Sequence, residues 1–464
     1  MSSPMAVRDK DMSIAALAER ISSLSSQLSS YLASNSFPEP RFTPDAGNVP
    51  ETHEYEALRA PLNDAALDLL RLINGPRRTL QEFFFSQYDL AALQIALDRR
   101  LFEHVPLPAA GSSPQDGDRA GEVQKASVAE IARKAGMDED RTGRVMKMLA
   151  THRIFEEVVV AADGSNGDSE SSSSTTTTTS SFTHTASSAV LARDDDFHAT
   201  AAMQMDDMLR AASELSAVVT RSPFASDAAH SAFHERFGVS MYQYYEQRPD
   251  KARRFTQAMS SWSKLDRSIE ELHTSFPWAS LKDGTVVDIG GGNGHISIGL
   301  AQKFPSLHFV VQDISPQMLS QAQQQQQDHG DGRVTFQQHD FFDPQPVQDA
   351  SAFLLRQCLH NNSDSDAVRI IRAVVPALER CAPGTPLLIN EVILPEPGTA
   401  TRFEEHHLRQ VDFCMMVTLG AKQRTEGEFD RLVKEADRRL EIVGVHRNPQ
   451  GVGLLEVQLN VPGR

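Results

Sequence analysis

The chain has 464 residues, of which 40% are hydrophobic and 23% are charged, a balance that is ordinary for a globular protein of two or three domains. Its formal net charge of −17, without any dense run of lysine and arginine, argues against nucleic acid as a partner. Three cysteines form neither a disulfide framework nor a zinc-site spacing, and no secretion signal or long apolar run is present. We therefore expect a cytoplasmic protein with no bound metal and no membrane span.

The N-terminal part of the chain predicts helices. Residues 13–35 place apolar side chains at helical spacing, and residues 36–52 are rich in proline and polar residues, which indicates a linker. A further helix is predicted to end at Gly75-Pro76. The helix–Gly turn–helix pattern of residues 127–158 then predicts a winged-helix unit.

Two strand-like segments follow the winged-helix pattern, and a low-complexity serine and threonine tract near residues 162–181 separates them. Because this tract has almost no apolar side chain to bury, we expect a disordered loop at the tip of the wing hairpin. The boundaries that these patterns suggest are 1–52 for the N-terminal helix and linker, 53–200 for a helical winged-helix domain, and 201–464 for a catalytic domain with a helical lead-in.

From Thr285 onward, short β-branched segments alternate with helical ones. This alternation predicts an α/β fold with a doubly wound, Rossmann-like parallel sheet. Two apolar segments near residues 435–460 are predicted to close the sheet as an antiparallel pair.

A glycine-rich turn follows the first of these strands, in the stretch VVDIGGGNGH, residues 286–295. Glycine permits a positive φ and lets a ligand approach the backbone closely. A dinucleotide fingerprint fails here because its third glycine position is His295, and the ending of a phosphate-binding loop is absent. Asp313 ends the next strand, where a carboxylate can accept ribose hydroxyls. The turn therefore predicts an adenosine-like ligand, and the alternative is a tight turn that binds nothing.

His360 lies in the polar turn RQCLHNNSDSD, residues 356–366, directly after another strand-like segment. A histidine in a loop is by itself a weak indication of catalysis, because exposed loop histidines are common.

The stretch VVDIGGGNGHISIGLAQKFPSLHFVVQDI, together with the winged-helix pattern before it, resembles the class I S-adenosylmethionine-dependent O-methyltransferases. Within that class it is similar to the plant caffeic acid O-methyltransferase type and to fungal polyketide O-methyltransferases. The resemblance covers the chain from about residue 55 and implies S-adenosylmethionine as the cofactor. The residues that it assigns to cofactor binding are Asp288, Gly290, Gly292, Asp313, Asp340, Phe341 and Arg356.

The resemblance also implies that His360 is the general base. A phenol with a pKa of about 10 is mostly protonated at neutral pH, and a neutral imidazole can take its proton during in-line displacement. The family flanks this histidine with two carboxylates, of which Glu391 is one. The second position lies in GAKQRT and is Gln423, which can hydrogen-bond the ring but adds no charge. Asn362 is a further departure, since many relatives have tryptophan there.

The family resemblance implies an aromatic small molecule as acceptor, with a phenolic or enolic hydroxyl, such as a polyketide of secondary metabolism. It also implies a homodimer formed through the N-terminal region. The side chains expected to line the acceptor pocket are Met241, Tyr244, Tyr245, Asp412, Met415 and Met416, for which ordinary core packing is the alternative.

Three other functions remain open at this level. A DNA-binding winged-helix regulator is suggested by the basic residues Arg141, Arg144, Lys147 and Arg153, although the net charge opposes it. A cofactor-binding scaffold without turnover is suggested by Gln423 and Asn362. A nicotinamide oxidoreductase is the weakest alternative, because the glycine pattern fails.

Overall fold

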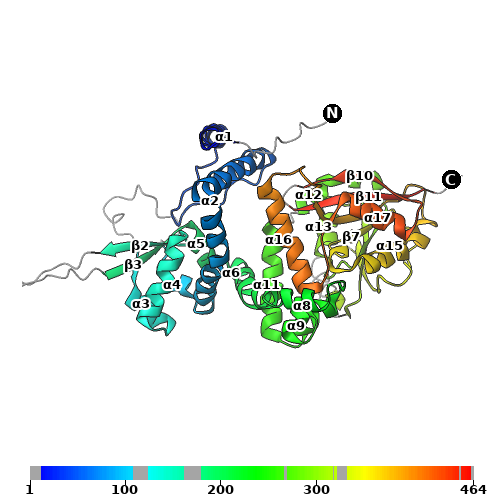
Figure 1. Cartoon of the computed structure of the whole chain (residues 1–464). Coiled ribbons are helices and arrows are strands. Elements are labelled where there is room, and N and C mark those ends of the chain that lie inside the picture. Colours follow the sequence, from blue (N-terminus) through cyan, green and yellow to red (C-terminus); the bar gives the residue numbers. More distant parts are fainter. Residues whose placement is uncertain are drawn as a thin grey trace, which may run out of the picture. The chain divides into compact units, whose positions relative to one another are not determined.

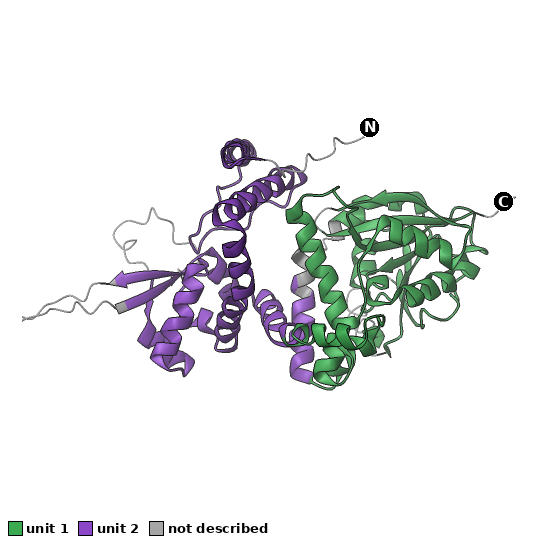
Figure 2. Ribbon diagram, viewed as in Figure 1, with its two compact units in different colours: residues 1–7, 210–248, 262–464 green, residues 8–209, 249–261 purple. Residues whose placement is uncertain are grey.

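The computed structural model of the chain describes residues 12–107, 124–160, 179–265, 269–316, 318–320, 332–448 and 451–460. Two compact units share these residues, as Figure 2 shows. Unit 1 contains Arg210–Arg248 and Trp262–Arg464, and unit 2 contains Arg8–Leu209 and Pro249–Ser261. The boundaries predicted at residues 52 and 200 remain a prediction.

Unit 2 is mainly helical and carries a small antiparallel sheet (Figure 1). Its long helix α2 is interrupted at Gly75, whose φ of 68° and ψ of 170° are not helical. The elements of unit 2 are α1 (Ile14–Ser34), α2 (His53–Asp98), η2 (Leu101–Glu103), β1 (Ala126–Ser127), α3 (Val128–Ala135), α4 (Glu139–Thr151), β2 (Phe155–Val160), β3 (Thr179–His184), α5 (Ala186–Arg193), α6 (Asp195–Met203), the π-helical turn η3 (Gln204–Met208) and most of α11 (Pro249–Leu265).

The winged-helix pattern is present in unit 2. Ser127 and Glu130 form the capping box of α3, Gly136 ends that helix in the left-handed conformation, and Asp138 caps α4. Strands β2 and β3 pair antiparallel as the wing, and β1 pairs with β3. Buried apolar side chains from α2, α3, α4 and the wing form one core beneath these elements.

The wing differs from the sequence prediction at one end. Strand β3 begins at Thr179, so residues 179–181 are paired with β2 rather than being part of a disordered insert. Backbone hydrogen bonds need no apolar side chains, and Ser180 Oγ also donates to Glu157 Oε1 at 2.6 Å. The rest of the predicted insert, up to residue 178, lies outside the described residues.

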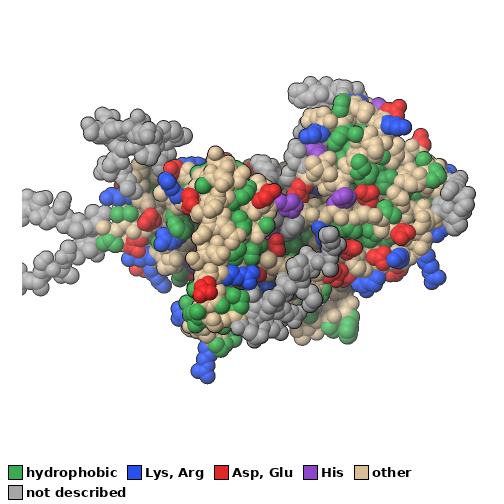
Figure 3. All heavy atoms as spheres, turned by 90° about the horizontal axis from the view of Figure 1, so that it is seen from above, with side chains coloured by type: hydrophobic (Ala, Val, Ile, Leu, Met, Phe, Trp, Pro, Cys, Tyr) green, Lys and Arg blue, Asp and Glu red, His purple; other side chains and the backbone are tan. Residues whose placement is uncertain are grey.

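Acidic neighbours accompany the basic side chains of α4 that suggested a DNA-binding regulator. Arg144 lies 3.9 Å from Asp140, and Lys147 lies 3.6 Å from Glu157. Over the face of the molecule seen in Figure 3, blue basic and red acidic side chains are interspersed. Such mixing weakens the attraction of a phosphate backbone.

Unit 1 consists of lead-in helices and a large mixed sheet covered by helices (Figure 1). The lead-in elements are α7 (Leu209–Ala212, whose first residue falls in unit 2), α8 (Leu215–Arg221), η4 (Ala228–His230), α9 (Ala232–Phe237), α10 (Met241–Glu246), α12 (Ile269–Ser275) and η5 (Trp278–Leu281). The sheet region contains β4 (Thr285–Ile289), α13 (His295–Lys303), β5 (His308–Asp313), β6 (Val334–Gln338), β7 (Ala352–Arg356), η6 (Leu359–Asn361), α15 (Asp364–Leu378), β8 (Leu387–Leu394), α16 (Arg402–Leu419), β9 (Arg424–Thr425), α17 (Glu426–Ala436), β10 (Leu440–His446) and β11 (Val452–Leu459).

The sheet of unit 1 has the strand order β10-β11-β8-β7-β4-β5-β6, and β9 pairs with β8. Strands β6, β5, β4, β7 and β8 are parallel, whereas β11 and β10 are antiparallel additions. Alternate residues of β4 and β7 enter different cores: Val287 and Phe353 pack with α15 and α17, and Val286 and Leu354 pack with α12 and α13. This confirms the predicted doubly wound, Rossmann-like fold with an antiparallel closing pair.

The strand order reverses between β4 and β7, since the chain passes from β4 to β5 on one side and later returns to β7 on the other. In open parallel sheets, a ligand-binding crevice lies beyond the carboxyl ends of the strands at such a switch point. Here the glycine turn follows β4, and His360 follows β7. Within the ranges that the structure describes, no helix has the length and apolar character needed to span a membrane.

Candidate active site

The glycine turn leaves β4 through three residues with positive φ: Gly290 (72°), Gly292 (58°) and Gly294 (71°). Side chains crowd around it. A Cβ atom at Gly290 would lie 2.8 Å from Cys358 Sγ, and one at Gly294 would lie 2.8 Å from the Phe336 ring. Only glycine therefore satisfies both the backbone conformation and the space at these two positions. The turn presents bare backbone at the switch point of the sheet.

Asp288, on β4 just before the turn, is a buried carboxyl group. It accepts a hydrogen bond from Ser297 Oγ at 2.6 Å. Burial raises the pKa of Asp288 to about 6, and the Ser297 hydrogen bond and the charge of Arg356 only partly oppose this effect. Burial likewise lowers the pKa of the Arg356 guanidinium, against the opposing charges of Asp288 and Glu391. Arg356 also donates to Asn390 Oδ1.

Asp313 closes the other side of the glycine turn from the end of β5. Its Oδ2 accepts the backbone N–H of Gly292 at 3.1 Å, and its Oδ1 accepts that of Ser315 at 2.8 Å. Each carboxylate oxygen has two lone pairs, so Asp313 retains acceptor capacity for hydroxyl groups. Phe341, after β6, also reaches the turn, since its ring lies 3.5 Å from a Cβ position at Gly290. Asp340 Oδ1 accepts the backbone N–H of Phe342 and shapes this loop.

His360 lies in η6 and is buried, with only 5% of its surface exposed. Its ring nitrogen Nδ1 lies 3.4 Å from Oε2 of Glu391, a fully buried residue of β8. The other oxygen, Glu391 Oε1, accepts the backbone N–H groups of Leu359 at 2.7 Å and His360 at 3.3 Å. The sequence prediction paired these two side chains, and the fold brings them together across neighbouring strands.

Gln423 also reaches the imidazole of His360. Its Nε2 lies 3.1 Å from Nδ1, and the side chain is buried. The backbone N–H of Gln423 donates to Asp412 Oδ1 at 2.8 Å, which ties the turn after α16 to that helix. Burial raises the pKa of Asp412 above its ordinary value. His360 thus has one carboxylate and one amide beside the same ring nitrogen.

The residues expected to line an acceptor pocket separate into two groups. Met241 and Tyr245 are buried, as is Tyr244, and Phe233 of α9 contacts Tyr244 edge-to-face and Tyr245 at a tilt. On α16, Met415 is half-buried and Met416 is 36% exposed. The α16 methionines are therefore the more accessible part of the predicted set.

Tyr242 lies near the glycine turn, next to the predicted pocket residue Met241, and was not among the residues predicted for the site. Although 53% of Tyr242 is exposed, surrounding protein still desolvates its phenol. This desolvation, with the nearby Cys358 and Asp313, raises the pKa of Tyr242 to about 12. It lies two residues after the Ser240 cap of α10, in the aromatic run of that helix, and this position is the sequence signal that could have pointed to it.

The matched family model is described as an O-methyltransferase domain and covers residues 216–438. The chain is 45% identical to the O-methyltransferase sol2 of Alternaria solani over 97% of its own length and 96% of that protein. The chain belongs to the O-methyltransferase family. It is also 28% identical to the chlorophenol O-methyltransferase of Trichoderma longibrachiatum, over 93% of this chain and 86% of that one.

Solved structures support the fold of this O-methyltransferase. OxaC matches with a TM-score of 0.70 and 19% identity over 96% of this chain and 99% of that chain. The mitomycin 7-O-methyltransferase MmcR matches with a TM-score of 0.59 and 21% identity over 87% and 99% of the two chains. LepI matches with a TM-score of 0.67 and 20% identity over 96% of this chain and 100% of that chain, and its solved structures include complexes with S-adenosylmethionine and with S-adenosylhomocysteine.

The cofactor of this O-methyltransferase is S-adenosylmethionine. The residues at the switch point fit such a group: the glycine turn is open to close approach, and the Asp313 carboxylate is held beside it. Within the described ranges, no group of three or more His, Cys, Asp or Glu side chains is placed to hold a metal ion.

Proposed function

We propose that this O-methyltransferase methylates a phenolic or enolic hydroxyl of an aromatic small molecule of fungal secondary metabolism, such as a polyketide, with His360 as general base. The observation that carries the proposal is the buried pair in which His360 Nδ1 lies 3.4 Å from Glu391 Oε2, at the switch point of the sheet. The fungal relatives, one of them named for the grayanic acid biosynthesis cluster of Cladonia grayi, support this acceptor class.

Each residue has a defined part in the proposed reaction. S-adenosylmethionine, when bound, supplies a methyl group on a positively charged sulfur. His360 Nε2 takes the proton of the acceptor hydroxyl as the oxygen–carbon bond forms and the carbon–sulfur bond breaks. For Nε2 to have a free lone pair, the neutral ring must carry its single N–H proton on Nδ1, which then donates to Glu391. The Glu391 carboxylate then stabilises the imidazolium that results.

The orientation of the Gln423 amide decides whether this tautomer is available. An amide N–H facing Nδ1 favours a ring that carries its proton on Nε2 instead. In such a ring Nε2 has no lone pair with which to take the proton of the substrate hydroxyl. A half-turn of the amide places Oε1 at Nδ1, where it accepts from Nδ1–H. We therefore propose that Gln423 works with its carbonyl oxygen toward the ring, as a neutral substitute for a second carboxylate.

The proposed cofactor site joins the glycine turn to the ends of the neighbouring strands. Asp313 would accept the ribose hydroxyls, with Asp288 and Arg356 beneath the turn and Phe341 beside it. For the acceptor ring we propose Met415 and Met416 of α16, near Asp412, because neither is fully buried and thioethers adapt to flat apolar ligands. Met241 and Tyr245 would support this pocket from within the core.

We further propose a homodimer formed through the apolar surface of α2. Phe83 of this helix is 77% exposed, and the ring of Phe85 contacts those of Phe84 and Tyr88 at its surface. Such a concentration of exposed aromatic side chains is unusual for a monomer and typical of an interface. The exposed apolar residues that define this surface are Leu67, Leu70, Leu72, Ile73, Leu80, Phe83, Phe84, Phe85 and Tyr88.

A cytoplasmic location is proposed on the state of the cysteines. Cys358, Cys381 and Cys414 are all free thiols, and the first two are buried. A reducing compartment preserves such thiols.

The test is mass spectrometry of purified protein incubated with S-adenosylmethionine and a panel of phenols, including chlorinated phenols and hydroxylated polyketides. We expect an acceptor that gains one methyl group. The variant His360→Ala should lose this turnover and still bind S-adenosylhomocysteine in calorimetry. A matched control is His446→Ala, which removes a histidine that also pairs with a glutamate, Glu456, at 3.1 Å on the surface. Full turnover in His360→Ala would exclude His360 as the base.

A further inference from the structure

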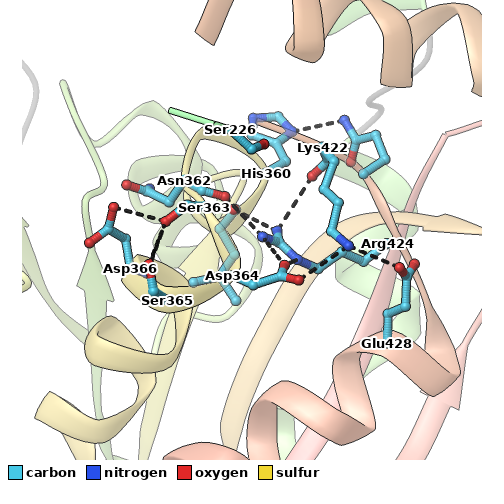
Figure 4. Close-up of polar contacts among 12 residues, drawn as sticks. Ser226, His360, Asn362, Ser363, Asp364, Ser365, Asp366, Lys422, Arg424 and Glu428 are labelled. Atoms are coloured by element: carbon cyan, nitrogen blue, oxygen red, sulfur yellow. Dashed lines mark hydrogen bonds and ion pairs between the residues drawn. The ribbon is translucent and has the colours of Figure 1, made fainter. Parts of the chain in front are cut away.

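Arg424 is a fully buried arginine directly after Gln423, and its guanidinium points at the turn that carries His360 (Figure 4). Nη1 donates to the carbonyl oxygen of Leu359 at 2.8 Å, and Nη2 donates to that of Asn362 at 2.9 Å. One planar group thus holds the carbonyl before His360 and a second carbonyl two residues after it.

The local backbone leaves the two carbonyls in different situations. Leu359 begins the short 3₁₀ turn η6, and its carbonyl already accepts the backbone N–H of Asn362 at 3.2 Å, so that Arg424 adds a second donor there. Asn362 follows the end of the turn, where carbonyl groups have no partner within the turn. A guanidinium satisfies several such acceptors in fixed directions, which an ammonium group cannot do.

The charge of Arg424 is balanced locally. Asp364 Oδ1 accepts from Nε at 2.9 Å and lies 2.8 Å from Nη2. Lys422 joins the same cluster, at 3.2 Å from Asp364 and 3.0 Å from Glu428 (Figure 4). The side chain of Asp364 is 51% exposed, so the buried cation is paired with a carboxylate that remains partly hydrated.

The opposite side of the turn is held by an anion. Glu391 Oε1 accepts the backbone N–H groups of Leu359 and His360. The peptide of Leu359 is therefore fixed at its N–H by a carboxylate and at its C=O by a guanidinium. Because the imidazole branches from this segment, both contacts determine where Nδ1 stands relative to Glu391 Oε2.

We propose that Arg424 is a positioning residue for methyl transfer, which holds the His360 turn so that the imidazole keeps its contact with Glu391. This inference rests on the proposed role of His360 as base. Arg424 itself touches neither the imidazole nor any reacting atom in this arrangement; it acts through the backbone of residues 359 and 362.

The first experiment compares Arg424→Lys with Arg431→Lys, a matched control whose side chain is 72% exposed on α17. The acceptor probe is whichever phenol of the panel the unmodified enzyme methylates. For Arg424→Lys we expect kcat to fall roughly 10- to 100-fold, since a misplacement of about 1 Å has effects of this size. The acceptor KM and the affinity for S-adenosylhomocysteine should stay within about threefold, because the glycine turn is untouched. The Arg431 control should leave all three unchanged.

A second readout does not depend on turnover. With ¹⁵N-labelled histidine in the S-adenosylhomocysteine complex, the ring signals of His360 are those absent from His360→Ala. Arg424→Lys should move these signals and shift their titration midpoint by roughly half a pH unit or more. A purely structural role for Arg424 would lower only the amount of folded protein and leave the signals and kcat per folded molecule unchanged. That result would overturn the inference.

If Arg424→Lys fails to fold, the variant Asp364→Asn tests the positioning role of Arg424 instead. It keeps an oxygen acceptor for Nε and removes the counter-charge at a half-exposed position, and Asp366→Asn in the same first turn of α15 is its control. We expect kcat to fall about threefold to tenfold only in Asp364→Asn; an unchanged kcat there would overturn the inference.

The variant His360→Ala separates the positioning role of Arg424 from the proposed role of His360 as base. Turnover without the imidazole removes the proposed base, whereas an inactive His360→Ala beside fully active position-424 and position-364 variants removes only the positioning role.

Discussion

Glu391 contacts both the ring and the backbone of His360: its Oε2 lies 3.4 Å from Nδ1, and its Oε1 accepts the His360 backbone N–H at 3.3 Å. A single buried carboxylate therefore orients the imidazole and anchors the turn from which it projects. This double contact makes the position of the ring depend on β8, a strand whose residues are all buried.

Glu391→Gln removes the charge of this residue and keeps an oxygen for the backbone N–H groups. A hydrogen bond to a charged group contributes roughly 1.5–3 kcal/mol. We therefore expect kcat to fall about 10- to 100-fold, with little change in cofactor affinity. Steady-state kinetics with the identified acceptor, beside calorimetry with S-adenosylhomocysteine, checks this. A kcat equal to that of the unmodified enzyme would mean that Glu391 does not stabilise an imidazolium.

Gln423→Glu introduces the second carboxylate that the family resemblance implies at this position. A negative charge beside the imidazole favours its protonated form. Since a general base must be unprotonated, the acidic limb of the kcat–pH profile should move to higher pH, by about one unit. At pH values above this limb, kcat should rise because the base is stronger. An acidic limb that moves to lower pH would contradict the proposed contact between residue 423 and the ring.

Gly290→Ala and Gly292→Ala separate backbone strain from crowding. Both positions have positive φ, which costs an alanine about 1 kcal/mol. Only at Gly290 would the added Cβ meet Cys358 Sγ at 2.8 Å, whereas Gly292 has Met318 Sδ at 3.8 Å. We expect a loss of about 2–4 kcal/mol in the free energy of unfolding at Gly290 and about 1 kcal/mol at Gly292.

Urea denaturation gives the free energy of unfolding of both glycine variants. The affinity for S-adenosylhomocysteine, measured by calorimetry, should fall more in Gly290→Ala than in Gly292→Ala. Adding Cys358→Ala to Gly290→Ala removes the clashing sulfur and should recover part of the lost stability. Equal losses at Gly290 and Gly292 would show that the neighbouring side chains relax without strain.

Asp288→Asn tests the buried carboxyl group beneath the glycine turn. Asp288 has a folded-state pKa of about 6 against an ordinary value of 3.8, so the folded protein holds this proton more tightly than the unfolded chain does. The contribution of Asp288 to the free energy of unfolding therefore falls as the pH rises between these two values. Relative to the unmodified protein, the variant should gain about 3 kcal/mol in the free energy of unfolding at pH 7.5, and roughly half of that gain at pH 5. Denaturation of the cofactor-free protein at both pH values provides the comparison. A gain that is equal at both would disprove the raised pKa.

Phe83→Asp tests the proposed homodimer. Phe83 is the most exposed residue of the apolar surface of α2, and a charged side chain there should convert the dimer to monomer at micromolar concentration. Phe224→Asp is the control, since Phe224 is 98% exposed and lies outside α2. Light scattering after size exclusion gives the mass of each variant. An unmodified protein that is monomeric would refute the proposal directly.

The glycine turn shows how far local sequence reaches. Positive φ at Gly290 and Gly292 and the placement of the turn between a buried strand and a helix follow from residue types and from period-two and period-3.6 patterns. The caps at Ser127 and Asp138 were likewise readable, because a cap is a contact between residues three positions apart.

Other features were invisible in the sequence because they join distant segments. Tyr242 is absent from the predicted set because the aromatic run of a short helix does not reveal which ring lies near Cys358 and Asp313. Thr179–Ser181 were assigned to a disordered insert because backbone pairing in a wing depends on the partner strand and not on side-chain hydrophobicity. Asn362 was considered only as a missing tryptophan, but its Nδ2 donates to Cys358 O at 2.8 Å and its carbonyl accepts from Arg424.

The sequence by itself determined the strand–helix alternation and the glycine turn, because each depends on neighbouring residues or on a local motif. The choice of His360 and Glu391 came from the family resemblance and not from a local pattern. Only the tertiary structure decided that Arg424 donates hydrogen bonds to the turn around His360, and that Gln423 and Glu391 both lie beside Nδ1 of His360. Those contacts span about 30 to 65 positions of the chain, and such distances are closed by sheet order and core packing rather than by local preference.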